Sequence, residues 1–328
     1  MKRTIITAGD FNLDEIFVRE YPEGTENRRK FVDRMVSCQI GGNAGNVSAE
    51  LAIMGWDVYP VVMFDESPQG HWAKDDLAMY GCNNRFVSCG PKGGTFMFRA
   101  THNRIMKDGS ITMGRRAFGP ASMFPKRHNI TVKDEVPALL GALDFVPDVF
   151  FFGSTVPGHR ALAEGLRERG SLIYFENQNA LKLENALYKS LELAHIIKMS
   201  DEHASLDQAN AFVTDYPGKL FILSMGKNGV RYNLRGQGWV TVPAVPAKVV
   251  DTEGAGDAMT AAFINALPCL DVANLTQNQV QAALEVAQKA SALAIQYYGS
   301  KGYIMNDPQY AHIAKVIKDR VETITDNR

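Results

Sequence analysis

Hydrophobic and polar positions along this chain follow two alternating patterns, which predict strands separated by helices. Seven short runs are rich in β-branched and aromatic residues, and they lie at positions 3–9, 57–64, 148–154, 171–176, 195–200, 219–226 and 247–251. Longer segments with apolar residues at helical spacing lie between them, and two of these, 43–55 and 159–170, end at a glycine. Short strands that alternate with longer helices are typical of parallel βαβ units, so we expect an α/β fold.

Two segments interrupt this alternation and predict a second, smaller sheet. Residues 13–40 are extended in pattern and dense in charge. Residues 92–120 contain the run TFMFRAT and an Asp108-Gly109 pair of the kind found in tight hairpins. Together the two inserts suggest a β-sheet lid over the main domain, although a pair of ordinary surface hairpins would have the same pattern.

Composition and charge exclude several functional classes. The chain has 328 residues, of which 45% are hydrophobic and 22% charged, enough for one large domain or two smaller ones. With a formal net charge of -1, the chain does not have the excess of basic residues that is typical of nucleic-acid-binding proteins. It also contains no run of about 18 apolar residues that would predict a membrane span. The four cysteines are scattered without a CxxC spacing. We therefore expect a cytoplasmic protein with reduced thiols and a small-molecule partner, and neither a nucleic acid nor a membrane.

The segment VVDTEGAGDAMTAAF, residues 249–263, carries the most specific candidate chemistry. Gly254 and Gly256 lack Cβ atoms, so the backbone can approach a ligand, and the helix predicted from 257 to 267 leaves its first amides without intrahelical partners. These amides and the helix dipole favour a bound phosphate or oxyanion. Asp257 is either an N-terminal cap of this helix or a base beside the anion, and its position predicts a depressed pKa.

Three motifs together resemble those of the ribokinase-like (PfkB) carbohydrate kinase family. DTEGAGD at 251–257 is similar to the family's C-terminal DTxGAGD, GGNAGN at 41–46 to its GG-x-x-x-N, and GDFNLD at 9–14 to its G-x-x-N-x-D. Their order along the whole chain makes the set much more specific than any one loop. The resemblance implies a single domain over residues 1–328, with a three-layer α/β fold, a doubly wound and mostly parallel sheet, and a lid formed by the inserts at 13–40 and 92–120.

The resemblance also implies a role for residues in each motif. It makes Asp257 the catalytic base, and it places an anion hole at the amides of Gly254, Ala255 and Gly256. The implied sugar-binding positions are Asn12, Asp14, Gly41, Gly42 and Asn46. The stretch LSMGKNG is similar to the family's nucleotide-side T-x-G-x-x-G. The implied ATP-binding positions are therefore Ser224, Gly226, Gly229 and Gln288. From the local sequence alone, Asn46 could equally cap its helix, and the 224–229 segment could be a plain turn.

The implied metal ligands are less regular. Asp251 matches a residue that helps to bind a monovalent cation, usually potassium, in many members of the family. The family's magnesium-organising NxxE element falls on the stretch SDEH at 200–203, where the asparagine is replaced and histidine stands at the glutamate position. Glu202 lies one residue away and could bind Mg²⁺ through water, or it could be a surface residue in the first turn of a helix.

The leading functional hypothesis is an ATP-dependent kinase, with Mg²⁺ and K⁺, that phosphorylates a hydroxyl of a small sugar or sugar acid. Fructose is the first choice, on family frequency. Four arginines of the second insert favour an anionic substrate unless they are simply exposed: Arg99, Arg104, Arg115 and Arg116.

Two alternatives stay open. In a nucleoside kinase of the same fold, Phe96, Phe98 and Phe118 would line a slot for the base. The altered 200–203 stretch motivates a non-catalytic sugar- or nucleotide-binding protein. The family resemblance also suggests a homodimer paired through the lid.

Overall fold

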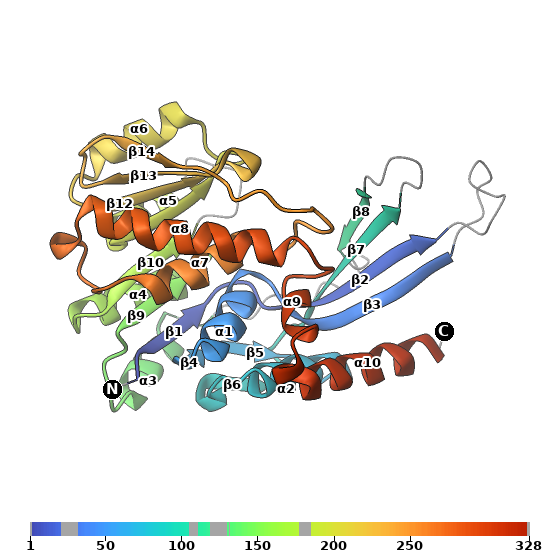
Figure 1. The fold of residues 1–328 in the computed structure, drawn as a ribbon. Helices are drawn as coiled ribbons and strands as arrows, with labels where there is room; N and C mark the ends of the chain where they lie inside the picture. The colour runs from blue at the N-terminus through green and yellow to red at the C-terminus, as the bar shows by residue number, and fades with distance from the viewer. Residues whose placement is uncertain are drawn as a thin grey trace.

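A large, mostly parallel sheet forms the centre of the molecule (Figure 1). The structure, a computed structural model, describes residues 2–20, 32–104, 111–118, 130, 132–176 and 185–326. The eight strands lie in the order β14-β13-β12-β11-β10-β9-β1-β4, and all neighbours are parallel except β12–β13 and β13–β14. In chain order they are β1 (Thr4–Ala8), β4 (Asp57–Pro60), β9 (Val149–Phe152), β10 (Leu172–Glu176), β11 (Ile196–Ser200), β12 (Leu220–Ser224), β13 (Val230–Leu234) and β14 (Trp239–Val242). The predicted α/β fold is confirmed.

Helices cover both faces of this sheet, because each strand sends alternate side chains to opposite sides. Phe151 points into one core and Phe150 and Phe152 into the other, and all three are 0% exposed. The helices of the Phe151 core are α1 (Asn43–Ile53), α2 (Pro68–Met79), α7 (Ala255–Ala266), α8 (Gln277–Ala294), α9 (Gly302–Met305) and α10 (Ala311–Asp326). Those of the opposite core are α3 (Glu135–Ala142), α4 (Pro157–Glu168), α5 (Asn185–Leu193) and α6 (Leu206–Asp215). The result is the predicted three layers.

A second sheet of four strands extends away from the main body (Figure 1). Its order is β3-β2-β7-β8, with β2 (Asn12–Glu20), β3 (Val32–Gly41), β7 (Phe96–Arg104) and β8 (Ile111–Phe118). These strands fall, to within one residue, in the two inserts, so the predicted small sheet is confirmed. The Asp108-Gly109 turn lies outside the described residues, although β7 and β8 on either side of it pair antiparallel. Because β1 leads directly into β2, and β3 into α1, the GDFNLD and GGNAGN segments lie where the chain passes between the two sheets.

Two predicted strands are wrong in detail. The run 57–64 divides into β4 and β5 (Val62–Phe64), and β5 pairs with β6 (Val87–Cys89) in a separate sheet. Pro60 is the last residue of β4, and the amide of Val61 still donates to the carbonyl of Thr7 in β1 at 2.9 Å before the chain turns into β5. The run 247–251 is not a strand, because the amides of Val250 and Asp251 donate to the carbonyl of Ile295 and not to a neighbouring strand.

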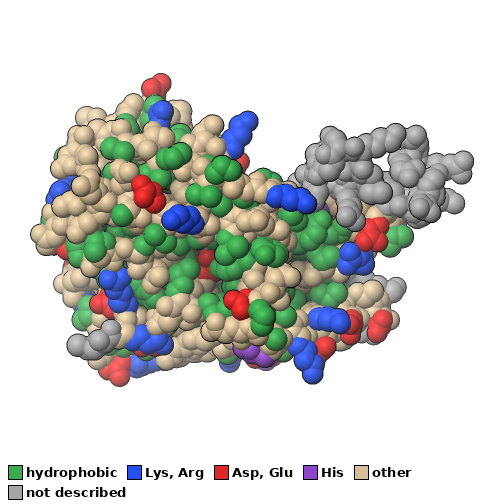
Figure 2. All heavy atoms as spheres, in the orientation of Figure 1, with side chains coloured by type: hydrophobic (Ala, Val, Ile, Leu, Met, Phe, Trp, Pro, Cys, Tyr) green, Lys and Arg blue, Asp and Glu red, His purple; other side chains and the backbone are tan. Residues whose placement is uncertain are grey.

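The surface shows no concentration of one charge on the face drawn in Figure 2. Lys and Arg side chains are interspersed there with Asp and Glu, and hydrophobic side chains lie between them. Within the described part of the chain, none of the helices has both the length and the apolar character needed to span a bilayer.

The C-terminal helix α10 is fastened to the small sheet by a buried ion pair. Arg320 of α10 donates to Asp76 of α2 through two hydrogen bonds of 2.7 and 2.9 Å, and to the carbonyl of Cys38 at 3.0 Å. Asp76 also accepts a 2.7 Å hydrogen bond from the amide of Ile40. The Arg320 and Asp76 side chains are 6% and 0% exposed. Since Cys38 and Ile40 belong to β3, this pair holds the strand that ends at Gly41.

We predict that Arg320→Leu strongly destabilises the protein, because it leaves the Asp76 carboxylate buried without its charge partner. Removing one member of a buried pair costs about 3–5 kcal/mol, and we expect the free energy of unfolding in urea to fall by that amount. The control is Lys318→Ala on the same helix, whose side chain is 76% exposed and lies 3.9 Å from Glu322. It should change the free energy by at most about 0.5 kcal/mol. Equal effects of the two variants would contradict a structural role for the buried pair.

Candidate active site

The 251–257 loop enters helix α7 through a left-handed glycine. Gly254 has φ 74° and caps the helix, which begins at Ala255. A Cβ on Gly254 would lie 2.1 Å from the Cβ of Ser300, so this position has no room for a side chain. The Ala255 amide makes only a long bond of 3.4 Å, to the carbonyl of Thr252. The first turn of α7 therefore keeps the anion-binding character of a helix N-terminus.

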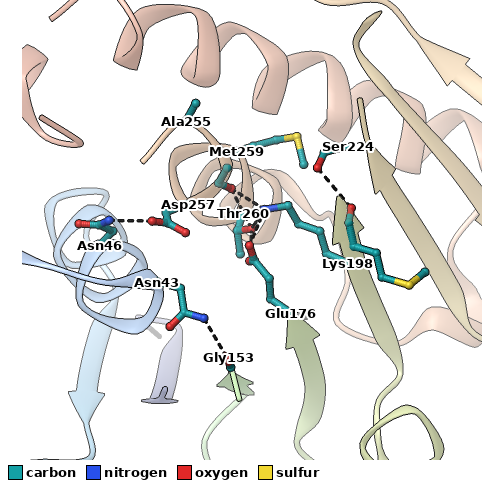
Figure 3. Close-up of polar contacts among 12 residues, drawn as sticks. Asn43, Asn46, Gly153, Glu176, Lys198, Ser224, Ala255, Asp257, Met259 and Thr260 are labelled. Carbon is teal, nitrogen blue, oxygen red and sulfur yellow. Dashed lines mark hydrogen bonds and ion pairs between the residues drawn. The ribbon is translucent and has the colours of Figure 1, made fainter. Parts of the chain in front are cut away.

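Asp257 lies in this first turn and faces helix α1 (Figure 3). Its Oδ2 accepts a hydrogen bond of 2.6 Å from Asn46 Nδ2, across 211 residues of sequence. The cap of α7 is Gly254 and that of α1 is Gly42. This arrangement favours a carboxylate presented at a site over the simpler capping roles of Asp257 and Asn46.

The pKa of Asp257 is raised to about 6, so the predicted depression is wrong. Burial is the largest cause, and the nearby negative charge of Glu176 adds to it. The charge of Lys198, the hydrogen bond from Asn46 and the charge of Lys301 lower the pKa by less. With 7% of the residue exposed, the partial charge of the helix end does not replace the lost hydration. A carboxylate with this pKa suits proton transfer near neutral pH.

A buried ion pair that the sequence analysis missed lies next to the start of α7 (Figure 3). Lys198 Nζ donates to Glu176 Oε1 at 2.8 Å and to the carbonyl of Gly256 at 2.6 Å. Thr260 Oγ1 accepts from Lys198 at 2.9 Å and lies 2.8 Å from Glu176 Oε2. The pair ties α7 to the ends of β10 and β11. Its only signal in the sequence is a lysine within the apolar run HIIKMS, since buried parallel strands rarely hold unpaired charge.

The N-terminal motifs form the opposite side of the site. Asp14 of β2 is 9% exposed, and a Cβ on Gly41 would lie 1.7 Å from its Oδ2. Asn12, at the start of β2, is paired in register with Gly41. Gly42 has φ 77°, and a Cβ there would meet the carbonyl of Asp10 at 2.4 Å. The two glycines therefore make room for the Asp14 carboxyl group and for the turn into α1.

Asp14 shares its electrostatic environment with the C-terminal loop. Burial raises the pKa of Asp14 to about 8, against the opposing charge of Lys301. The negative charges of three loop residues add to the rise: Glu253, Asp257 and Asp251. Among the described residues, Asp14 Oδ1 is a buried acceptor with no hydrogen-bond partner. An oxygen of this kind is available to a ligand that brings a hydroxyl group.

Lys301 is a second buried charge that the sequence analysis missed. It is 0% exposed, and its Nζ donates to Asn46 Oδ1 at 2.5 Å and to Ser300 Oγ at 2.8 Å. Ser300 Oγ also donates to Asn46 Oδ1, at 2.8 Å. Because Lys301 and Ser300 both donate to this oxygen, the amide nitrogen of Asn46 is turned toward Asp257. No spacing in the sequence signals this lysine, since it follows a glycine-serine turn far from every motif.

The predicted ATP-binding residues lie at the end of β12, in the turn that follows it and on helix α8. Ser224 ends β12 and donates to the carbonyl of Met199 at 3.2 Å (Figure 3). Gly226 and Gly229, with φ 51° and 87°, bound the short turn η3 (Gly226–Asn228). Gln288 of α8 is 6% exposed and its amide lies 3.3 Å from the sulfur of Met259, so this side chain packs α8 onto α7.

The two predicted metal ligands lie in different settings. Glu202 is exposed on the turn after β11, whereas Asp251 is buried. Asp251 accepts amide hydrogen bonds from Glu253 at 2.9 Å and Gly299 at 2.8 Å. In the described ranges, no group of three or more His, Cys, Asp or Glu residues could hold a metal ion. An exposed Glu202 fits a Mg²⁺ that keeps most of its waters. The N–H donors around Asp251 do not fit a bound cation.

Fold and site together define an α/β protein that can hold an anion at a helix start and accept a proton at an adjacent carboxylate. Residues 189–305 match the family described as pfkB family carbohydrate kinase. The chain is 41% identical over 87 residues to ribokinase from Bacillus subtilis (strain 168). This alignment covers 26% of the chain and 27% of that ribokinase, so the chain spans about a quarter of the length of the relative that it matches.

Two solved structures show the same likeness over nearly the whole chain. Fructokinase from Xylella fastidiosa with bound ATP superposes with a TM-score of 0.69 at 17% identity, covering 91% of this chain and 94% of that one. A nucleoside kinase from Burkholderia thailandensis in complex with inosine superposes with a TM-score of 0.66 at 20% identity, covering 91% of this chain and 93% of that one. At these identities the likeness establishes the fold. The comparisons confirm the predicted resemblance to the PfkB family and the ribokinase-like fold.

Gly254→Ala tests the tight turn before α7. Both the positive φ and the contact with Ser300 oppose a side chain there, so the free energy of unfolding should fall. The control is Gly236→Ala, which has nearly the same φ of 75° but no atom within 4 Å of an added Cβ. Backbone strain alone costs about 1–2 kcal/mol at such a position. Urea unfolding should show a clearly larger loss for Gly254→Ala, and equal losses would mean that the contact with Ser300 relaxes freely.

Proposed function

We propose that this protein transfers the γ-phosphoryl group of ATP to a hydroxyl group of a small sugar or sugar acid, with Asp257 as the general base. The observation that carries the proposal is the 2.6 Å hydrogen bond from Asn46, which holds the buried Asp257 carboxylate beside the N-terminus of α7. The family match and the names ribokinase and fructokinase support the same reaction.

The start of α7 would hold the phosphoryl group during transfer. The amides of Gly254, Ala255 and Gly256 would offset the negative charge that the migrating group carries. Asp257 would receive the hydroxyl proton late, because the transition state of phosphoryl transfer is loose and the attacking oxygen loses its proton only as the new bond forms. A carboxylate with a pKa of about 6 is basic enough for this task.

The polar end of β2 and the start of α1 would bind the sugar. The positions concerned are Asn12, Asp14, Gly41, Gly42 and Asn46. Since the pKa of Asp14 is about 8, its carboxyl group is protonated at neutral pH and offers the sugar both a donor and an acceptor. The small sheet, as a lid, would exclude the water that otherwise competes as phosphoryl acceptor.

ATP would lie along the ends of β11 and β12, at Ser224, Gly226 and Gly229. Mg²⁺, when bound, neutralises charge on the phosphate oxygens. It would arrive with the nucleotide and keep most of its waters, and Glu202 would contact one of those waters from the exposed turn after β11.

Fructose stays the first choice of acceptor, on family frequency, and two contacts in the small sheet bear on the alternatives. Arg99 donates to Glu15 Oε2 at 2.8 Å, so its charge is already paired and offers less to an anionic substrate. Phe98 is 8% exposed and packs with Ile16 and Ala100, so it fills the core of the sheet and does not line a slot for a base. The side chains of the other residues named for these alternatives, Arg104, Arg115, Arg116, Phe96 and Phe118, lie outside the described part of the chain, so sugar acids and nucleosides stay in the panel of acceptors to be tested.

An ADP-release assay across neutral sugars, sugar acids and nucleosides tests the proposal, and we expect turnover with a neutral sugar. With that acceptor, Asp257→Asn should retain binding but lower kcat by roughly 10²–10⁴-fold, the range for a positioned base. Asp215→Asn, an exposed change at the end of α6, serves as the control and should leave kcat unchanged. Near-normal turnover in Asp257→Asn would remove this residue from the mechanism. Ligand-induced thermal stabilisation without turnover of any acceptor would favour a binding protein.

The raised pKa of Asp257 predicts the pH dependence of the reaction. Above a pH of about 6 the carboxylate is free to accept a proton, and below it the group is protonated and inactive. We expect kcat/KM to be level between about pH 6 and pH 8, where Asp257 is charged and Asp14 is still protonated, and to fall about tenfold per pH unit below pH 6. Asn46→Ala removes a hydrogen bond that stabilises the charged form, so its acid limb should move to higher pH. A limb near pH 4, the value for an unperturbed Asp, would contradict the assignment.

A further inference from the structure

Asp251 is fully enclosed at the start of the anion-binding loop. Its side chain is 0% exposed. Oδ1 accepts from the amide of Glu253, and Oδ2 accepts from the amide of Gly299 and lies 3.3 Å from Nε2 of His102. A buried carboxylate must be paired, hydrogen-bonded or bound to a metal, and here the three contacts all come from nitrogen.

His102 reaches this carboxylate from the small sheet. It lies in β7 and is 1% exposed. Its ring packs against that of Tyr298 at a centroid distance of 5.5 Å, so the imidazole is held between the loop and the segment that leads to Gly299. Nε2 is not aligned for a regular hydrogen bond, and the contact with Asp251 is therefore electrostatic. Nε2 carries hydrogen in the charged ring and in one neutral tautomer, and both present positive charge to the carboxylate.

These contacts stabilise the anionic form of Asp251 without a metal. Two amide hydrogen bonds and the His102 ring surround its two oxygens, and each of these three contacts directs an N–H or a ring nitrogen at the carboxylate. A cation bound to the same oxygens would stand beside these N–H groups, whose positive ends repel it. The imidazole also occupies one approach to Oδ2.

We propose that His102 takes the place of the monovalent cation that the family resemblance implies at Asp251, so that the 251–257 loop is ordered without potassium. In place of an exchangeable ion, the loop has a covalently attached partner that also ties it to β7 of the small sheet. The inference concerns the stability of the loop, so it stands or falls independently of the proposed kinase reaction.

Thermal unfolding in equal concentrations of KCl, NaCl and choline chloride tests the proposal on the ligand-free protein. We expect the Tm of the wild type to be the same in all three salts. His102→Ala should lower the Tm by about 5 °C or more in choline chloride, because it removes the partner of a buried carboxylate. Part of this loss should return in KCl, since the shortened side chain opens a place beside Asp251. His312→Ala, an exposed change on α10, is the control and should behave as the wild type.

Three results would overturn the proposal. The first is a saturable rise in wild-type Tm with K⁺ that choline does not produce. The second is a His102→Ala protein that is as stable as His312→Ala. The third is a loss of stability in His102→Ala that no cation restores, which would show a packing role. If His102→Ala does not fold, His102→Gln, which keeps an N–H donor, decides the matter. The His102→Gln protein should fold without K⁺. If it folds only with K⁺, the proposal that His102 takes the place of the cation is wrong.

Discussion

The hydrogen bond between Asn46 and Asp257 is the interaction on which the organisation of the site depends. It joins the first turn of α1 to the first turn of α7, two helix starts that are separated by most of the chain. Such a short contact requires the two helices to approach closely. Glycines at 42 and 254 begin the two helices with a positive φ, in turns that have no room for a side chain, because a Cβ would meet Asp10 in the first turn and Ser300 in the second. The oxygen of Asn46 is occupied by Ser300 and Lys301, which fixes the direction of its amide.

Three buried pairs of ionisable side chains hold the elements around this contact. Glu176 is paired with Lys198, Asp76 with Arg320, and Asp251 with His102. In a medium of low polarity each pair is costly to break, and each holds a different element in place. The pairs hold the end of β3, the start of α7 and the 251–257 loop in one frame, so the Asp257 carboxylate lies among elements that are fixed by buried contacts.

The small sheet contributes residues to two parts of the candidate site. Its strand β2 carries Asn12 and Asp14, and its strand β7 carries His102, which contacts the loop in front of α7. A movement of this sheet would therefore change the surroundings of Asp14 and of the 251–257 loop together.

Much of the fold and the main motifs could be predicted from the amino-acid sequence, because periodicity and bare glycine turns are local properties. Short apolar runs separated by segments with helical spacing are sufficient to predict a layered α/β fold, and the segments GGNAGN and DTEGAGD each predict a helix that begins at a glycine turn. What the sequence could not show depends on burial and on partners distant in the chain. The raised pKa of Asp257 comes from lost hydration and from Glu176, and the contact of Asp251 with His102 joins a loop to a strand of the small sheet. Only the tertiary structure decides which charges meet, since electrostatic energy depends on distance in space and on exclusion of water.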